Sequence, residues 1–310
     1  MFNDTNKPVH FSEYGLESIA VPGELSGHVH IFKKYGSGKV KWEDLFKYAI
    51  KFASEGFPVG DHLANAIKQK SKDLNDIDEL REVYTNPNTS QLYKVGETFK
   101  QPQLANTLIE LSKSASPEIL FYNTIAKKII ADLKKMADKL PFRGQKIYIT
   151  ETDFRQYEVV ESSDYSFPIR INGREIILHT ARLPGSGILL QFIIKLMSRY
   201  SDLYPKAYID QTKAELFYHR LMESFKFAFA NRQYLGDDKF DNVENIVNRL
   251  QDDKYIHEVF NKISDDKTFD ANNEEHYDKR VQMKFDSGTA HLSVLDREGN
   301  AVAITATINL

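Results

Sequence analysis

Residues 288–310 constrain the fold of this chain more than any other stretch, because they read as two β-strands joined by a tight turn. Polar and apolar residues alternate on both sides of Arg297-Glu298-Gly299, which has the form of a three-residue hairpin loop with glycine at the position that needs positive φ. Pairing Asp296 with Asn300 across this loop fixes every later pair. The predicted register has three polar-face pairs: Thr289 with Thr307, His291 with Thr305, and Ser293 with Ala303.

The two faces of this predicted hairpin differ in polarity, because neighbouring residues of a strand point to opposite sides. One face carries only apolar residues: Ala290, Leu292, Val294, Val302, Ile304, Ala306, Ile308 and Leu310. Most hairpins with one apolar side pack that side on a hydrophobic core, so we expect this face to be covered. The other face carries Thr289, His291, Ser293, Thr305, Thr307 and Asn309.

The polar face suggests a specific chemistry at Gly288 and Thr289. A threonine hydroxyl is a poor nucleophile unless a base lies beside it, and one solution is a threonine at the start of a chain, whose own α-amine is that base. An α-amine titrates at about 7.7–8.0, within reach of neutral pH. The Gly288–Thr289 bond is therefore a candidate self-cleavage point. An ordinary edge hairpin without any catalytic role is the alternative that this pattern leaves open.

The same stretch resembles the signature of the gamma-glutamyltransferases (glutathione hydrolases), in Gly288 to Val294, Gly299 to Val302 and Thr305 to Asn309. Further blocks resemble this family in the same order along the chain: Ala20 to Glu24 with Gly27, Trp42 to Phe46, Gly56 to Val59, Phe121-Tyr122-Asn123, Pro184 to Gly187, His219-Arg220 with Glu223, Phe225 to Ala228, and Leu235-Gly236-Asp237. Several blocks in the right order are far more specific than one motif. The chain is thereby identified as resembling this family over nearly its whole length.

This resemblance implies an α+β fold of the N-terminal nucleophile hydrolase type, an αββα sandwich that is incomplete in this chain. It also implies a precursor, or zymogen, that cuts itself autocatalytically between Gly288 and Thr289. Residues 1–288 would then be the C-terminal part of the large-subunit region, and residues 289–310 would begin the small-subunit region.

The resemblance also assigns roles to three residues of the polar face. Thr289 would be the nucleophile that forms a γ-glutamyl ester, with its freed amine as base. Thr307 would hydrogen-bond this nucleophile. Asn309 would help to hold the α-amino acid end of the donor.

The implied donors are glutathione and other gamma-glutamyl compounds, and the implied acceptors are water, amino acids or dipeptides, with no cofactor. The family's arginine for the donor carboxylate would precede Met1. Its acidic residues, serine pair and oxyanion-hole glycines would follow Leu310, so the missing remainder of the small subunit is an expected partner. One lost oxyanion donor costs about 2.7–4 kcal/mol. We therefore expect the 310-residue chain alone to be inactive and its full-length parent to be the enzyme.

Composition limits which binding partners and which kinds of site this chain can have. A chain of 310 residues that is 41% hydrophobic can bury a large core. The formal net charge of −3 gives no reason to expect nucleic acid or an anionic membrane as a partner. There is no cysteine, so a disulfide or a thiolate site is ruled out. The nine histidines are isolated or wrongly spaced for a metal site, and we predict none.

Both ends of the chain resemble internal parts of the family. Met1-Phe2-Asn3 is similar to an internal stretch, and Leu310 lies inside the signature, so we expect a fragment of a longer protein. The resemblance places the parent at the extracellular face of the plasma membrane or among secreted proteins, with any anchor or signal outside this chain. Two sequons make Asn3 and Asn88 candidate glycosylation sites.

The rest of the chain is predicted to be mostly helical from its hydrophobic periodicity. The expected helices are 22–35, 42–53, 61–72 with Asp61 as cap, 102–112, 116–140, a short one after Thr150, 188–197, 213–234, 243–250 and 254–263. Asn172-Gly173 predicts a second hairpin, over 167–171 and 175–180. Residues 264–287 are charged and nearly free of apolar side chains, which predicts an extended, mobile segment or an ordinary surface loop.

Two rival functions remain. A related acylase would use the same nucleophile on another amide, and the Asn309 match argues against it. A catalytically silent homologue would act as a binding or interaction protein, and the intact Thr289 and Thr307 argue against that. His291 lies close to the nucleophile, but on the hairpin we expect it to hydrogen-bond structurally.

Overall fold

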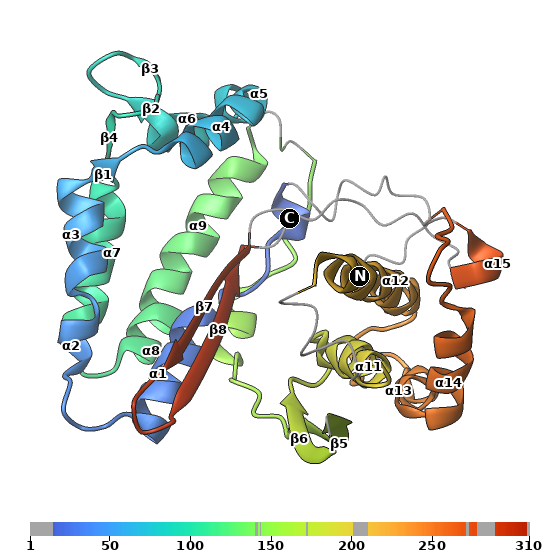
Figure 1. Ribbon diagram of the computed structural model, residues 1–310. Coiled ribbons are helices and arrows are strands. Elements are labelled where there is room, and N and C mark those ends of the chain that lie inside the picture. Colours follow the sequence, from blue (N-terminus) through green and yellow to red (C-terminus); the bar gives the residue numbers. More distant parts are fainter. Residues whose placement is uncertain are drawn as a thin grey trace. The chain divides into compact units, whose positions relative to one another are not determined.

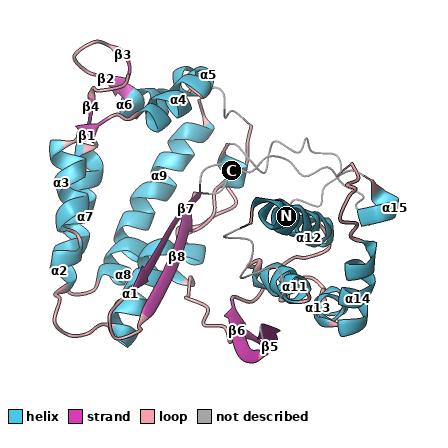
Figure 2. Ribbon diagram, viewed as in Figure 1, coloured by secondary structure: helices cyan, strands magenta, loops and turns pink. Residues whose placement is uncertain are grey.

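A computed structural model describes residues 15–139, 142, 144–171, 173–200, 210–270, 273–277 and 289–308. The chain forms two compact units, the first comprising Met1–Val159 with Ser287–Leu310 and the second Val160–Asp286. Helices and strands occur in both units (Figures 1 and 2). The predicted mixture of α and β structure is thus confirmed.

The first unit is built mainly from short helices. Its helices are a 3₁₀ turn at Leu16–Ser18, α1 (Glu24–Tyr35), α2 (Trp42–Leu45), α3 (Lys47–Glu55), α4 (Asp61–Gln69), α5 (Ser71–Asp76), α6 (Asp78–Tyr84), α7 (Pro102–Lys113), α8 (Pro117–Ile119), a π-helical segment Leu120–Ile125, α9 (Ala126–Ala137) and α10 (Glu151–Arg155). Its strands are β1 (Phe57–Pro58), β2 (Thr85–Asn86), β3 (Gln91–Leu92), β4 (Thr98–Phe99), β7 (Thr289–Leu295) and β8 (Ala301–Thr307).

Two apolar clusters hold the first unit together. One gathers around Phe154 of α10, which is fully buried, and includes Leu16, Tyr122, Ile130 and Leu133 from three other segments. The other is centred on Phe99, whose ring contacts three further aromatic rings: Phe57, Tyr84 and Tyr93. The described strands of this unit pair as three two-stranded antiparallel sheets, β1 with β4, β2 with β3 and β7 with β8.

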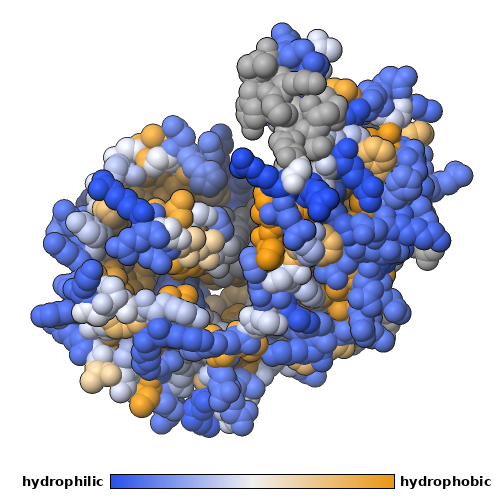
Figure 3. All heavy atoms as spheres, turned by 60° about the horizontal axis from the view of Figure 1, so that its bottom comes forward, coloured by the Kyte–Doolittle hydropathy of each residue, from blue (hydrophilic) through white to orange (hydrophobic). Residues whose placement is uncertain are grey.

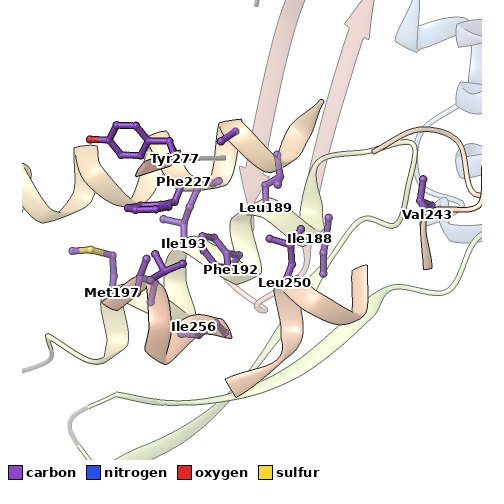
Figure 4. Close-up of a cluster of buried hydrophobic side chains, with 14 of the residues drawn as sticks. Ile188, Leu189, Phe192, Ile193, Met197, Phe227, Val243, Leu250, Ile256 and Tyr277 are labelled. Carbon is purple, nitrogen blue, oxygen red and sulfur yellow. The ribbon is translucent and has the colours of Figure 1, made fainter. Parts of the chain in front are cut away.

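The second unit surrounds one central helix. Its elements are β5 (Tyr165–Ile171), β6 (Arg174–Thr180), α11 (Gly187–Ser198), α12 (Gln211–Arg232), α13 (Glu244–Gln251), α14 (Asp253–Lys262) and α15 (Glu274–Tyr277). Ile188, Phe192 and Leu196 of α11 recur every four residues and are fully buried, as the predicted central helix requires. Figure 4 shows side chains from α11, α12, α13 and α14 meeting around Phe192 and Ile193.

Glycine is required where α11 begins. A Cβ added at Gly187 would lie 2.1 Å from the carbonyl oxygen of Ala181 and 2.8 Å from the side chain of Thr180. Gly187 closes the Pro184 to Gly187 block, so this block allows the helix to begin directly against the end of β6.

Three predicted helices differ from those observed. The helix predicted over 42–53 is divided at Phe46 into α2 and α3. Asp61 is the first helical residue of α4 and not its cap, because Gly60 occupies the cap position without any side-chain bond. The helix predicted over 116–140 contains a π-helical segment at Leu120–Ile125, which includes the Phe121-Tyr122-Asn123 block. Hydrophobic periodicity assumes 3.6 residues per turn and does not predict a π segment, whose wider turn shifts the phase of the helix; Ile119, just before it, is 63% exposed, whereas Tyr122 and Ala126 are buried.

The segment 264–287, predicted to be mobile or an ordinary surface loop, is attached to α12 in the part of it that the structure describes. Residues 264–270 and 273–277, which we call the strap, lie on α12, and Tyr277 at its end is 1% exposed. Few apolar residues suffice here because hydrogen bonds to buried groups of α12 supply the attachment. Residues 271–272 and 278–288 lie outside the described residues.

The surface is largely polar, in line with a mean hydropathy of −0.47. Figure 3 shows hydrophilic residues over most of the visible face, with smaller hydrophobic areas between them. None of the described helices combines the length and the apolar composition that crossing a bilayer requires.

Candidate active site

The predicted register of the C-terminal hairpin is confirmed. Strands β7 and β8 pair antiparallel from Thr289 opposite Thr307 to Leu295 opposite Ala301. His291 faces Thr305 and Ser293 faces Ala303, as the turn predicts. The polar residues of the two strands therefore share one face of the hairpin.

The turn that fixes this register is held by Asp296. Its carboxylate accepts hydrogen bonds from the backbone amides of Glu298 and Asn300 at 2.9 and 2.8 Å, and from the Asn300 side chain at 2.8 Å. These bonds, that from the Asn300 side chain first among them, hold the pKa of Asp296 below its ordinary value. Gly299 has a φ of 87°, the conformation that made glycine the expected residue at this position.

The two threonine hydroxyls of the polar face are hydrogen-bonded to each other. Thr289 Oγ1 donates to Thr307 Oγ1 over 3.3 Å, and both residues are exposed. A hydroxyl that donates to Thr307 leaves its own lone pairs free to attack a carbonyl from the open side of the strand. The contact fixes the position of Thr289 Oγ1 relative to β8.

His291 lies on the same polar face and is hydrogen-bonded to residues other than Thr289. Its Nδ1 lies 2.8 Å from Thr305 Oγ1 and its Nε2 lies 2.9 Å from Ser293 Oγ. Both ring nitrogens are thus engaged by hydroxyls other than that of Thr289. The contacts fit the structural role expected for this histidine.

The apolar face of the hairpin is uncovered by the described part of the chain. Leu292, Val294 and Val302 are 61%, 52% and 47% exposed, respectively. The expectation that this face packs on a core is therefore wrong for residues 15–308 as far as they are described. Among those residues the face is thus largely exposed apolar surface, with Ile304 and Ala306 half-buried.

Of the other predicted site residues, the structure describes only Asn88. Gly288, Asn309 and Asn3 lie outside the described residues. Asn88 lies in the exposed turn between β2 and β3, where its backbone amide donates to Asn86 Oδ1 at 2.9 Å. Its side chain is open to solvent, as glycosylation requires.

A second cluster has the composition of a catalytic triad but not its geometry. On β5 and β6, Ser166 Oγ lies 3.0 Å from His179 Nδ1, and the carboxylate of Asp164 contacts the same nitrogen. A triad needs the acid on one imidazole nitrogen and the hydroxyl on the other. The cluster therefore cannot relay a proton from serine.

In the described part of the chain, no group of three or more His, Asp or Glu side chains is placed to hold a metal ion.

One further candidate, Glu223 of α12, could not be singled out from the sequence pattern alone. It entered only as part of a family block, yet its carboxylate is 2% exposed and accepts hydrogen bonds from the strap. The signal available in the sequence was a glutamate among apolar residues on a helix, which is rarely buried unless it is paired.

The whole chain is similar in sequence to known proteins of one family. The sequence matches the model of the gamma-glutamyltranspeptidase family over residues 1–310. It is 35% identical over 299 residues to Scoloptoxin SSD14 of Scolopendra dehaani, covering 96% of this chain and 48% of that protein. It is 32% identical over 296 residues to glutathione hydrolase 3 of Arabidopsis thaliana, covering 95% of this chain and 42% of that protein.

The fold agrees with a solved structure of the same kind. The crystal structure of Helicobacter pylori gamma-glutamyltranspeptidase superposes with a TM-score of 0.68 at 26% sequence identity, covering 86% of this chain and 70% of the other. The chain spans about half the length of the curated relatives it matches.

Proposed function

The chain belongs to the gamma-glutamyltranspeptidase family, and on this premise we propose that its full-length parent cleaves the γ-glutamyl bond of glutathione and other γ-glutamyl compounds. The γ-glutamyl group passes to water, amino acids or dipeptides. The names of relatives such as glutathione hydrolase 3 support this substrate class. The observation that carries the proposal is the 3.3 Å hydrogen bond between the hydroxyls of Thr289 and Thr307 at the predicted register.

The first step of the proposed mechanism is self-cleavage between Gly288 and Thr289. The Thr289 hydroxyl attacks the carbonyl carbon of Gly288, a C–O bond forms, and the C–N bond of the peptide breaks as the nitrogen takes a proton. Water then hydrolyses the resulting ester. The products are a carboxylate at Gly288 and a free α-amine on Thr289, which is the base that the internal threonine lacks.

Turnover follows from the new chain end. The Thr289 α-amine accepts the hydroxyl proton as Oγ1 attacks the γ-glutamyl carbonyl, and it returns that proton to the departing amine. Thr307 fixes the attacking hydroxyl, and Asn309 holds the α-amino acid end of the donor. Water or an acceptor amine then attacks the γ-glutamyl ester and releases Thr289 for the next cycle.

The proposed subunit assignment follows the same cut. Residues 1–288 belong to the large-subunit region and residues 289–310 begin the small-subunit region. The remainder of the small subunit covers the apolar face of β7 and β8 and completes an αββα sandwich of N-terminal nucleophile hydrolase type. The exposure of Leu292 and Val294 supports this assignment. We propose that residues 1–310 alone are inactive because the strand that carries the nucleophile lacks this support.

We further propose that the parent acts at the extracellular face of the plasma membrane or after secretion. The exposed sequon at Asn88 supports this location, because N-linked carbohydrate is added in the secretory pathway. Asn3 is the second candidate for this modification.

The proposal is tested with the purified full-length product and a γ-glutamyl anilide that releases a chromophore. We expect release of the chromophore, competition by glutathione, and no release by the 310-residue chain. A related acylase would release the chromophore without competition by glutathione, and a silent homologue would not release it at all. Either result contradicts the proposal.

A further inference from the structure

Helices α2 and α3 expose a row of apolar side chains. Leu45, Tyr48 and Phe52 are 53%, 65% and 51% exposed, and their spacing of three and then four residues places them on one side of the helices. Phe46, between the two helices, keeps helical dihedral angles, so the row is continuous. We call these three residues the exposed stripe.

The other side of the same helices packs on α7 (Figure 1). Ala53 is buried there, and its carbonyl oxygen accepts a hydrogen bond of 2.9 Å from the amide of Gln101 at the start of α7. A surface helix ordinarily buries one apolar side and presents polar residues to solvent. Because α3 is apolar on a second side as well, the stripe has the character of an interaction surface.

Lysines are concentrated in the same part of the chain. Residues 33–55 carry a net charge of +3, whereas the whole chain carries −3. The exposed charged residues of this segment are Lys33, Lys34, Lys39, Lys41, Lys47 and Lys51, with Glu43, Asp44 and Glu55. Lys33 is paired with Glu118 at 2.8 Å, and Lys51 approaches Glu55 at 3.9 Å. The charge of the whole chain therefore conceals a basic segment around the exposed stripe.

We propose that the exposed stripe and the lysines beside it bind the surface of a phospholipid membrane. Tyrosine and other aromatic side chains favour the headgroup level of a bilayer. Lysine lays its alkyl chain along apolar surface and keeps its ammonium group in the polar layer, where lipid phosphates lie. Helices α2 and α3 would thus lie in the plane of the membrane surface with the stripe directed into it.

A second copy of the chain fits this surface less well. A two-fold contact through the stripe would bring the lysines of one copy towards those of the other, and like charges across an interface oppose association. A membrane accepts both components, because headgroup phosphates meet the ammonium groups while the rings of Tyr48 and Phe52 enter the layer below. The inference does not depend on the chemistry proposed at Thr289.

Trp42 is a built-in reporter for this surface, because it is the single tryptophan of the 310 residues. It begins α2, three positions before Leu45. Its ring lies 5.4 Å from that of Phe32 and 5.0 Å from that of Phe46, and its Nε1 donates to the carbonyl oxygen of Leu111 at 3.2 Å. Brominated lipids should therefore quench its fluorescence when α2 and α3 lie on the membrane.

The chain offers a matched control for the aromatic part of the surface. Tyr48→Ser with Phe52→Ser removes one tyrosine and one phenylalanine from the stripe. Tyr218→Ser with Phe229→Ser removes the same two residue types from α12, where they are 61% and 43% exposed. We expect the stripe variant to bind vesicles about tenfold more weakly than wild type, because burial of each ring is lost. The α12 variant should bind like wild type.

A second pair of variants tests the lysines. Lys39→Ala with Lys41→Ala removes two charges beside the stripe, and Lys127→Ala with Lys128→Ala removes two exposed charges from α9. We expect the first variant to bind vesicles that contain phosphatidylserine about 30-fold more weakly. It should lose less on vesicles of phosphatidylcholine alone, and the α9 variant should bind both kinds like wild type.

Binding is measured by sedimentation with vesicles, for the 310-residue chain and for the full-length product prepared without any membrane anchor. Circular dichroism confirms that each variant is folded. Quenching of Trp42 by brominated lipids is measured with the 310-residue chain, and we expect it in wild type. These two readouts separate binding from the place at which the chain binds.

Four results would overturn the proposal. The first is that wild type sediments with neither kind of vesicle. The second is binding without quenching of Trp42, or with equal losses for the stripe and α12 variants, which would assign it to another surface. The third is an effect of the stripe variant on the 310-residue chain alone, since a segment outside this chain would then cover the stripe. The fourth is a dimer that the stripe variant dissociates, which would make a second copy the occupant.

Discussion

Thr289 and Thr307 are directly opposed across the β7–β8 ladder, and their hydroxyls are hydrogen-bonded at 3.3 Å. Nothing in the composition of the chain requires this contact. It results from a turn whose glycine and aspartate allow one register only. The pair is therefore the natural place to begin testing the proposed chemistry.

Replacing Thr307 by valine keeps the shape of the side chain and removes the hydroxyl that receives the bond from Thr289. One net hydrogen bond contributes about 0.5–1.5 kcal/mol, so we expect the full-length product to be cleaved about 2–10-fold more slowly and to turn over more slowly by a similar factor. The matched control is Thr305→Val on the same face, whose hydroxyl contacts His291 instead. If Thr307→Val and Thr305→Val are cleaved and turn over at equal rates, the hydroxyl of Thr307 has no specific role in the mechanism.

Stability of the second unit should depend on the central helix α11. Phe192 is 0% exposed, so Phe192→Ala should lower the free energy of unfolding by about 3–5 kcal/mol. Phe240 is 85% exposed, and Phe240→Ala should change it by no more than about 0.5 kcal/mol. Urea unfolding followed by circular dichroism compares the two. Similar losses for both would contradict the assignment of the core.

Acid should loosen the strap in two stages. Burial lowers the pKa of His276 below its ordinary 6.5, so the unfolded chain takes up this proton first and stability falls as pH drops below about 6.5. Burial raises the pKa of Glu223, but hydrogen bonds from Lys226, Thr268 and Tyr277 outweigh it and bring the pKa below its ordinary 4.5. The contribution of Glu223 is therefore present above about pH 4.5 and lost as pH falls through its folded pKa.

Hydrogen exchange of peptides from 264–270, corrected for intrinsic rates, measures this loosening between pH 7.5 and pH 4. His276→Phe keeps an aromatic ring on Phe269 and removes the titrating group, so it should abolish the first stage and keep the second. If protection of these peptides from exchange does not change between pH 7.5 and pH 4, attachment of the strap does not depend on protonation of His276 and Glu223, and the prediction is wrong.

Carbohydrate should be found at Asn88 when the protein passes through a eukaryotic secretory pathway. The residue is exposed in a turn and its sequon is intact. Treatment with a glycosidase should lower the mass of wild type, and Asn88→Gln should remove the part of this shift that comes from Asn88. Ser90→Ala keeps Asn88 but destroys the sequon, so it should behave as Asn88→Gln. A peptide containing unmodified Asn88 from secreted protein would contradict the prediction.

Sequence patterns predicted elements whose cause is local. The register of the C-terminal hairpin followed from Asp296 and Gly299, and the central position of α11 followed from apolar residues on most sides of Ile188 to Met197. The short helix predicted after Thr150 is likewise present, and it begins with a capping box in which Asp153 Oδ2 accepts from the Thr150 amide at 2.7 Å. In each case, neighbours in the sequence determine the geometry.

Features that depend on distant partners could not be predicted in the same way. The strap looked mobile because it has few apolar residues, and its attachment depends on Glu223, more than forty positions earlier. The exposure of Leu292 and Val302 was not predicted because alternation shows which face is apolar but not what covers it. The π segment at Leu120–Ile125 was not predicted because the apolar spacing was read with 3.6 residues per turn throughout, and Ile119 before it is exposed as a result.

The central claim is that Thr289 becomes the first residue of a chain, and mass spectrometry with N-terminal sequencing of the purified full-length product tests it most directly. We predict two polypeptides, one ending at Gly288 and one beginning at Thr289, and a single uncut polypeptide for Thr289→Ala. An intact wild-type product that still releases the γ-glutamyl chromophore, or a new chain beginning at any other residue, would contradict the account.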